Sequence, residues 1–278
     1  IQSQCISDPT LMSKQKFYKA QCNGNDFVLL LKDELEITLD ESAISKLCNR
    51  RRGVGSDGLI LIDTSSDAQD FKMDYHNSDG SWETMCANGA LCCVLLLQSK
   101  GYSFKSHTFT AGDGEHHIKF TENTLSIKMK APRDVTGQIS VQGFSGAHID
   151  SGARHFVTHC DERDYEVLHS SATRIRYDDL FKPSGLNVNF LIVKGDGHID
   201  VVTYEKGIEK IMLSCGSGSV AAAFYASQNS NMQSPLRISN PGGEMHLTFN
   251  EDWTDLWLSS HPMILFSSTI DLDLIDLG

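Results

Sequence analysis

Short segments in which apolar and polar residues alternate run through most of the chain, and they predict β-strands separated by turns rich in glycine, asparagine and proline. In the first half, Phe17–Leu31 predicts two strands joined by a tight turn, and residues 40–49 predict a short helix. Another helix is predicted over 162–176. The remaining strands are predicted at 59–62, 71–76, 107–111, 115–120, 124–129, 148–149, 156–157, 187–194, 199–204, 236–238, 245–249, 255–258 and 263–266.

Two segments depart from this alternation because they are apolar or small throughout, which is typical of helices buried on all sides. The first follows the phrase Cys86-Ala87-Asn88-Gly89-Ala90, and the second follows Cys215-Gly216-Ser217-Gly218-Ser219. In both halves of the chain, strands precede the cysteine phrase, and a helix and more strands follow it. The two phrases stand roughly half the chain apart, which predicts duplication of one α/β unit.

The segment between the two units, residues 131–147, is poor in large apolar side chains and contains Pro132 and three glycines. We place the domain boundary in or just before it. The predicted N-terminal half spans 12–135 and carries Cys86, and the C-terminal half spans 136–263 and carries Cys215. The last strand, 264–278, is a candidate to return to the N-terminal half.

Composition narrows the classes of function. A chain of 278 residues with 40% hydrophobic and 22% charged residues is typical of a soluble globular protein. Its formal net charge of −12 argues against binding to nucleic acid or to an anionic membrane surface. No apolar stretch approaches the roughly 20 residues of a membrane span. We therefore expect a small-molecule partner.

The start of the chain and the cysteines bear on location. No basic region followed by an apolar core marks a signal peptide. Residues 1–11 are polar and patternless, and Met12 is a candidate natural start, so 1–11 are interpreted as a tag remnant or a disordered leader. The eight cysteines are predicted to be reduced thiols of a cytoplasmic protein, and none has the C-x-x-C spacing of a zinc site, so no metal is expected.

A cysteine at the start of a buried helix has specific chemical use. A free thiol has a pKa of about 8.5, and the positive end of a helix dipole lowers it toward neutrality, where a proton donor or acceptor works best. The unpaired N–H groups of the following small residues can bind a carboxylate. Two such cysteines facing one carbon would allow a proton to be removed from one face and returned to the other.

The phrases and their flanks resemble the diaminopimelate epimerase family, which belongs to the racemases that act without pyridoxal phosphate (PLP). The matching stretches are Gly24-Asn25-Asp26-Phe27, Arg52-Gly53-Val54-Gly55-Ser56-Asp57, Asn77-Ser78-Asp79-Gly80, Met85-Cys86-Ala87-Asn88-Gly89-Ala90, Gly185-Leu186-Asn187-Val188-Asn189-Phe190, Tyr204-Glu205-Lys206-Gly207 and Ser214-Cys215-Gly216-Ser217-Gly218. They run in the family's order from about residue 16 to 220.

The resemblance implies an α+β fold of two pseudo-symmetric halves, each a mainly antiparallel, barrel-like sheet around a central helix. It implies epimerisation by two bases, Cys86 and Cys215, with His155 and Glu205 tuning the thiols. It also implies a homodimer without a cofactor. The residues expected to contact the substrate are Asn25, Asn77, Ala87, Asn88, Asn187, Glu205, Lys206, Gly216 and Ser217.

Two departures fall where the family binds the distal end of its substrate. The stretch Gly152-Ala153-Arg154-His155 has alanine where the family often has asparagine, and Lys206 replaces an arginine. Lysine cannot grip a carboxylate at two points as arginine does. Either Arg154 and Lys206 together rebuild the grip on diaminopimelate, or the substrate is an amino acid with another tail.

Two other functions stay open at this stage. Gly216-Ser217-Gly218-Ser219-Val220-Ala221 fits a loose dinucleotide fingerprint, which would suggest a nucleotide-binding oxidoreductase. However, the acidic residue expected about 20 positions later is missing, and the stretch lies in a strand-rich half. A non-catalytic relative used for binding is the other alternative, and retention of both cysteines argues against it.

Overall fold

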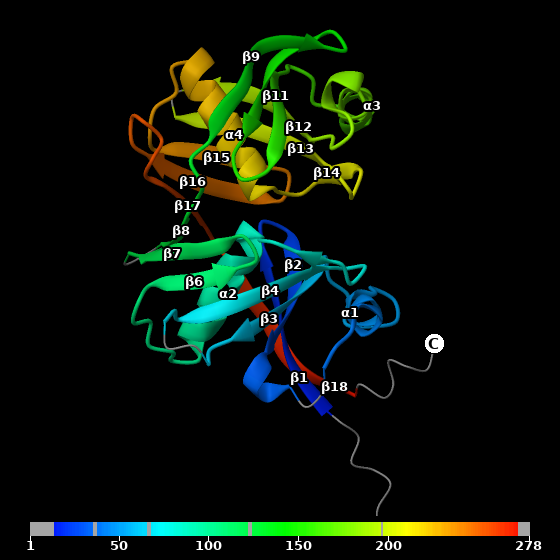
Figure 1. Cartoon of the computed structure of the whole chain (residues 1–278), viewed down its shortest axis with the longest axis vertical. Coiled ribbons are helices and arrows are strands. Elements are labelled where there is room, and N and C mark those ends of the chain that lie inside the picture. Colours follow the sequence, from blue (N-terminus) through cyan, green and yellow to red (C-terminus); the bar gives the residue numbers. More distant parts are fainter. Residues whose placement is uncertain (1–13, 36–37, 66–67, 122–123, 196, 272–278) are drawn as a thin grey trace, which may run out of the picture.

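The computed structural model describes residues 14–35, 38–65, 68–121, 124–195 and 197–271. The predicted leader, 1–11, and the last residues of the chain lie outside this part. The described chain forms two lobes stacked along the long axis (Figure 1). Each lobe encloses one apolar helix in strongly curved β-structure, because a helix without a polar face has to be covered on every side.

The lower lobe in Figure 1 is built around α2 (Ala87–Ser99), whose residues are buried almost throughout. The helix α1 (Glu41–Cys48), capped by Asp40, and the 3-10 helix η1 (Lys32–Glu34) lie at its periphery. The strands of this lobe are β1 (Lys14–Cys22), β2 (Asn25–Leu31), β3 (Gly58–Asp63), β4 (Phe71–Asn77), β5 (Trp82–Glu83), β6 (Thr108–Ala111), β7 (Gly114–Phe120), β8 (Leu125–Lys128) and β18 (Met263–Asp271).

The upper lobe is built around α4 (Gly216–Asn229), which is equally apolar. Helix α3 (Tyr165–Arg176) packs outside the sheet, followed by the 3-10 helix η2 (Asp179–Phe181). The strands of this lobe are β9 (Arg133–Val141), β10 (Phe144–Asp150), β11 (Arg154–His159), β12 (Asn187–Gly195), β13 (His198–Glu205), β14 (Lys210–Met212), β15 (Leu236–Asn240), β16 (Gly243–Phe249) and β17 (Leu256–Ser260).

Strand pairing repeats between the lobes. Strands β2 and β3 run parallel, as do β11 and β12, and each pair continues into an antiparallel neighbour, β4 or β13. The register of these two parallel pairs shows which position of one lobe corresponds to which position of the other. Phe27 pairs with Gly58 as His155 pairs with Asn187, so Asn25 in the lower lobe corresponds to Ala153 in the upper one.

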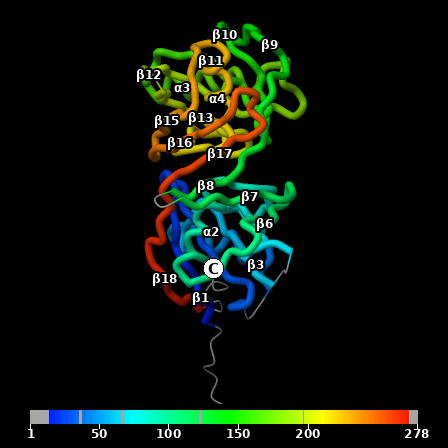
Figure 2. Tube along the Cα trace, turned by 90° about the vertical axis from the view of Figure 1, so that its left-hand side faces the viewer, coloured from blue at the N-terminus to red at the C-terminus, as the bar shows by residue number. Residues whose placement is uncertain are grey.

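The lobes are joined by hydrogen bonds between strands as well as by the covalent connections of the chain. β8 pairs with β7 on one edge and with β17 of the other lobe on its other edge. β18 leaves the upper lobe and pairs with β1 over most of its length, as Figure 2 shows along the side of the lower lobe. The predicted boundary after residue 135 falls inside β9. We propose to divide the lobes at 129–132, between β8 and β9.

The hairpin of β9 and β10 occupies most of residues 131–147, a segment poor in large apolar side chains in which we predicted no strand. β9 is exposed along nearly all its length, so its side chains carry no alternation that marks a strand. Its partner β10 buries Ala147 and Ile149, and pairing with β10 holds β9 extended.

Candidate active site

Both cysteines occupy the N-cap of their lobe's central helix. Cys86 precedes α2 with φ −135° and ψ 116°, and Cys215 precedes α4 with φ −143° and ψ 115°. Neither side chain makes a regular capping hydrogen bond to its helix. The duplicated phrase therefore places two thiols in the same local conformation, one in each lobe.

The two helix starts touch. A Cβ built on Gly216 would lie only 2.7 Å from the Cβ of Ala87, so glycine is required for this approach. The two thiols interact electrostatically with each other and with one carboxylate. Negative charge on Cys215 raises the pKa of Cys86, and negative charge on Glu205 raises the pKa of both thiols. Cys86, Cys215 and Glu205 thus form one electrostatic cluster between the lobes.

Burial dominates the electrostatics of the thiols. It raises the pKa of each to about 12, although both residues keep some exposed surface. Backbone N–H groups at the helix starts, from Asn88 and Gly89 on one side and from Ser217 and Gly218 on the other, lower the pKa by less. The expectation that the helix start brings the thiol pKa close to neutrality is therefore wrong, because desolvation outweighs the helix start.

Glu205 is the group that titrates near neutrality. It lies at the end of β13, half-buried, and burial raises its pKa to about 7, with further contributions from the negative charges of Glu83 and Asp57. The carboxyl group therefore changes its charge near neutral pH and affects both thiols when it does.

On the upper side, a chain of hydrogen bonds runs from Cys215 into the core. The Cys215 Sγ lies 3.6 Å from the Ser217 Oγ, which lies 3.0 Å from His155 Nε2. His155 Nδ1 lies 2.8 Å from Asn189 Oδ1, and Asn189 Nδ2 donates to Thr203 Oγ1 at 2.8 Å.

The buried amide of Asn189 fixes the tautomer of His155. Because its Nδ2 donates to Thr203, its Oδ1 faces the imidazole and can only accept, so His155 Nδ1 carries the hydrogen and Nε2 accepts from Ser217. Burial lowers the pKa of His155 to about 4, which keeps the ring neutral at physiological pH. Ser217 Oγ is then free to accept from the Cys215 thiol.

On the lower side, Cys86 faces amides instead. Its thiol donates to Asn25 Oδ1 at 3.7 Å, and Asn88 Nδ2 donates to Ser214 Oγ at 2.7 Å and more weakly to Asn25 Oδ1 at 3.5 Å. Asn88 in the lower lobe and Ser214 in the upper one thus join the helix starts across the interface.

The other predicted residues stand at the ends of strands. Asn77, at the end of β4, accepts from the Tyr75 hydroxyl at 3.1 Å. Asn187, at the start of β12, donates to the Arg154 carbonyl at 3.2 Å and accepts from the Lys206 N–H at 2.8 Å.

At the two positions that depart from the family pattern, the cationic side chains already have partners within the protein. The Lys206 ammonium donates to the Ser184 carbonyl at 3.3 Å, and Arg154 Nε lies 3.4 Å from His148 Nε2. Ala153 offers no amide where its counterpart Asn25 does.

Some potential sites receive no support in the described part of the chain. No group of three or more His, Cys, Asp or Glu side chains is placed to hold a metal ion there. The helices that we describe are too short or too polar to cross a membrane. The glycine fingerprint at Gly216 opens α4 directly after β14, which is antiparallel to β13, whereas in a dinucleotide site the helix directly follows a strand of the parallel sheet.

Comparison with known proteins settles the family. The family model described as diaminopimelate epimerase matches residues 17–135 and 147–258. The chain belongs to the diaminopimelate epimerase family. Diaminopimelate epimerases of Flavobacterium psychrophilum and Chlorobaculum tepidum are 34% and 32% identical to it, over 92% and 90% of this chain and 100% and 98% of theirs. As a member of this family, the chain is an epimerase that works without PLP.

Solved structures share the fold. A probable proline racemase from Agrobacterium radiobacter K84 gives a TM-score of 0.70 at 12% identity over 94% of both chains. A hydroxyproline epimerase from Agrobacterium vitis gives 0.69 at 11% identity, covering 92% of this chain and 91% of its own. The predicted α+β fold of two similar halves is confirmed.

Several residues of the site were not predicted from the sequence. Asn189 and Thr203 hold His155 from behind, Ser214 meets Asn88, and Tyr75 meets Asn77. The spacing offered a signal for Asn189, Tyr75 and Thr203. Each stands two positions from a predicted site residue (Asn187, Asn77 or Glu205) on or at the end of a predicted strand, and side chains two apart share a face.

The titration of Glu205 predicts a pH-dependent stability. Its pKa is about 7 in the folded protein and ordinarily 4.5, so the folded state binds more protons between these values, and the free energy of unfolding falls as pH rises through that window. We expect Glu205→Gln to raise the free energy of unfolding at pH 8 by up to about 3 kcal/mol, with no gain at pH 4. Urea unfolding at both pH values, with the exposed Glu251→Gln as control, measures this; an equal gain at both would contradict it.

Proposed function

We propose that this protein inverts an amino-acid α-carbon with Cys86 and Cys215 as its two acid–base groups. The observation that carries the proposal is the contact between the helix starts, at Ala87 and Gly216, each preceded by one of these cysteines. One thiolate removes the α-hydrogen as a proton, and the electron pair stays on the α-carbon. The other thiol donates its proton to the opposite face, so the two cysteines exchange protonation states in each turnover.

The reacting carboxylate is proposed to lie against the helix starts. The N–H groups of Ala87, Asn88, Gly216 and Ser217 stand in the first turns of two helices that meet, and such groups stabilise negative charge. Charge from the carbanion spreads onto this carboxylate, so the same donors also stabilise the transition state.

The two predicted tuning groups have different tasks in this proposal. Ser217 can accept from the Cys215 thiol or rotate to donate to its thiolate, with His155 accepting the hydroxyl hydrogen in the first state. Glu205, with a pKa of about 7, favours protonated thiols when it is ionised. A substrate ammonium group near the site would oppose that effect and the cost of burial, and so would generate the thiolate when substrate is bound.

Diaminopimelate, interconverted between its LL and meso forms, is the substrate that we propose, with a place in lysine and cell-wall biosynthesis in the cytoplasm. Family membership supports it. Asn25, Asn77, Asn187 and Lys206 are proposed as further contacts. The second candidate is racemisation of an amino acid with another distal group, which is favoured by Ala153 and by the Lys206 ammonium bound to Ser184.

We also propose a homodimer formed through β18. Among the described residues, its only strand partner is β1, and its side chains Met263, Leu265 and Phe266 are about half exposed. An apolar edge strand of this kind is normally covered, and a second copy of the chain supplies a matching edge.

Exchange in heavy water tests the reaction and its substrate. We expect the wild-type protein to incorporate deuterium at the α-carbon of diaminopimelate faster than in amino acids with other distal groups, as followed by NMR. Cys86→Ala and Cys215→Ala should each slow stereochemical inversion at least about a hundredfold, since each removes a proton donor and acceptor. The control Cys160→Ala removes a thiol elsewhere in the upper lobe. Undiminished inversion in either variant of the pair would refute the mechanism.

Oxidation tests whether the two thiols meet. Facing thiols can form a disulfide, so an oxidant should abolish activity and a reductant should restore it. Mass spectrometry should find the peptides of Cys86 and Cys215 joined when activity is lost. Full activity after verified joining of this pair would contradict the proposal.

The dimer is tested by the mass in solution. Analytical ultracentrifugation should give about twice the chain mass of 30.7 kDa, and Phe266→Asp should shift the protein to monomer by placing a charge in the interface. Val135→Asp is a matched control, because β9 is the corresponding exposed strand of the upper lobe. A monomeric wild type, or a dimer that Phe266→Asp leaves intact, would rule out this interface.

A further inference from the structure

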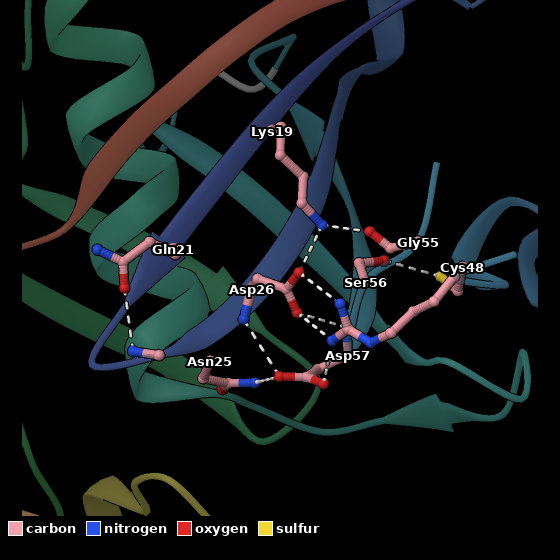
Figure 3. A network of polar contacts seen from close by, with 10 residues as sticks. Lys19, Gln21, Asn25, Asp26, Cys48, Gly55, Ser56 and Asp57 are labelled. Carbon is pink, nitrogen blue, oxygen red and sulfur yellow. Dashed lines mark hydrogen bonds and ion pairs between the residues drawn. The ribbon is translucent and has the colours of Figure 1, made fainter. Parts of the chain in front are cut away.

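A carboxylate behind the lower half of the site holds one end of Asn25. Asn25 Nδ2 donates to Asp57 Oδ2 at 2.9 Å, as Figure 3 shows. The same carboxylate accepts from the backbone N–H of Asp26 at 3.2 Å and from Arg50 at 2.7 Å. Asp57 is thus fixed from three directions, and one of its oxygens is committed to the Asn25 amide.

A second carboxylate anchors this arrangement. Asp26 accepts two hydrogen bonds from Arg50, at 2.6 and 3.0 Å, and one from the largely buried Lys19 at 2.6 Å. Although burial acts in the opposite direction, Arg50 and Lys19 hold the pKa of Asp26 at about 2, so it stays charged. Lys19 also donates to the Gly55 carbonyl. The network in Figure 3 therefore joins the buried Lys19 to the exposed Arg50 through Asp26.

The other end of Asn25 faces the reacting thiol. Its Oδ1 accepts from Cys86 at 3.7 Å and from Asn88 Nδ2 at 3.5 Å. An amide has one donor end and one acceptor end, so a partner that binds the donor end also decides what the acceptor end faces. Asp57 can only accept when it is ionised, and this orients the Asn25 oxygen toward Cys86.

We propose that Asp57 is a positioning residue that keeps the Asn25 carbonyl oxygen facing Cys86 and thereby disfavours the Cys86 thiolate beyond the effect of burial. An oxygen acceptor beside a thiol stabilises the neutral S–H and repels the thiolate. Cys215 differs, because the Ser217 hydroxyl can turn to donate to a thiolate. The proposal rests on the proposed function of Cys86, and it adds that the two thiols, although both are buried, differ in how readily each forms a thiolate.

Other titratable groups also face Cys86 and have to be held constant in a test. They come from α2, β4, β13 and α4, and they are Tyr75, Cys92, Cys93, Glu205 and Cys215. A Cys215→Ala background removes the one thiol that reacts with the substrate together with Cys86 and whose titration would couple to it.

The experiment measures the rate of alkylation of Cys86 by iodoacetamide between about pH 7 and 9, followed by mass spectrometry of the Cys86 peptide. Because only the thiolate reacts, the rate below the midpoint of thiolate formation rises about tenfold per pH unit, so a displaced midpoint appears as a changed rate at fixed pH. The experiment uses no substrate, so its result is independent of the test of the proposed function. The positioning role of Asp57 can be refuted while the epimerase activity stands, and the activity can be refuted while the positioning role stands. In the Cys215→Ala background, Asp57→Asn should lower the midpoint for Cys86 by about 0.5 to 1 pH unit, because the Asn25 amide is free to turn its Nδ2 toward the thiolate.

A double-mutant cycle separates positioning from the charge of Asp57 itself. In an Asn25→Ala background, Asp57→Asn should no longer move the midpoint. The same displacement in both backgrounds would mean that the carboxylate acts directly, and no displacement in either would mean a purely structural role; both results overturn the proposal. Asp70→Asn is the matched control, because Asp70 is a buried carboxylate of the same lobe that holds the backbone of Lys105 and Thr108.

Arg50→Gln keeps the proposal testable if Asp57→Asn does not fold. Arg50 is more than half exposed, so its loss leaves the core intact, but Asp57 loses an anchor. Loss of the Arg50 positive charge cannot by itself lower the midpoint for a thiol, whereas release of the Asn25 amide lowers it. A lower midpoint supports the proposal, and an unchanged or higher one overturns it.

Discussion

The starts of α2 and α4 touch, and they can do so only because position 216 has no Cβ. Most other features of the site follow from this contact. It brings an N-cap cysteine from each lobe into one electrostatic cluster, and it places the first turns of the two helices, with their N–H groups, next to each other. The apolar helices behind these starts need complete cover, and each lobe supplies that cover with a curved sheet.

The contact also buries much of both thiols, and burial disfavours their charged thiolate forms. A helix start favours a thiolate, but removing the sulfur from water opposes it more strongly, so burial favours the protonated form of both cysteines. Reactivity therefore has to be generated when substrate arrives, not stored beforehand. The partially exposed position of both cysteines and the near-neutral titration of Glu205 fit such a site, because both respond to a charged ligand.

Much of this could be predicted from the sequence. Apolar segments after Cys86 and Cys215 predicted the central helices, alternation predicted most strands, and the duplicated phrase predicted two similar halves. β9 was missed because an exposed hairpin strand has no buried face to reveal it. The supports of His155 were missed for another reason: Asn189 and Thr203 meet it only through pairing of β11, β12 and β13, and such pairing depends on register. Likewise, the dominance of burial over the helix start depends on packing that no motif records.

The pairing of β8 with β17 has a mechanical consequence. The chain passes from the lower to the upper lobe directly after β8 and returns directly after β17, and these two strands are hydrogen-bonded to each other. The lobes are therefore linked by a two-stranded antiparallel ladder, not by a single flexible tether. Pulling them apart would break backbone hydrogen bonds, whereas twisting about the ladder would not.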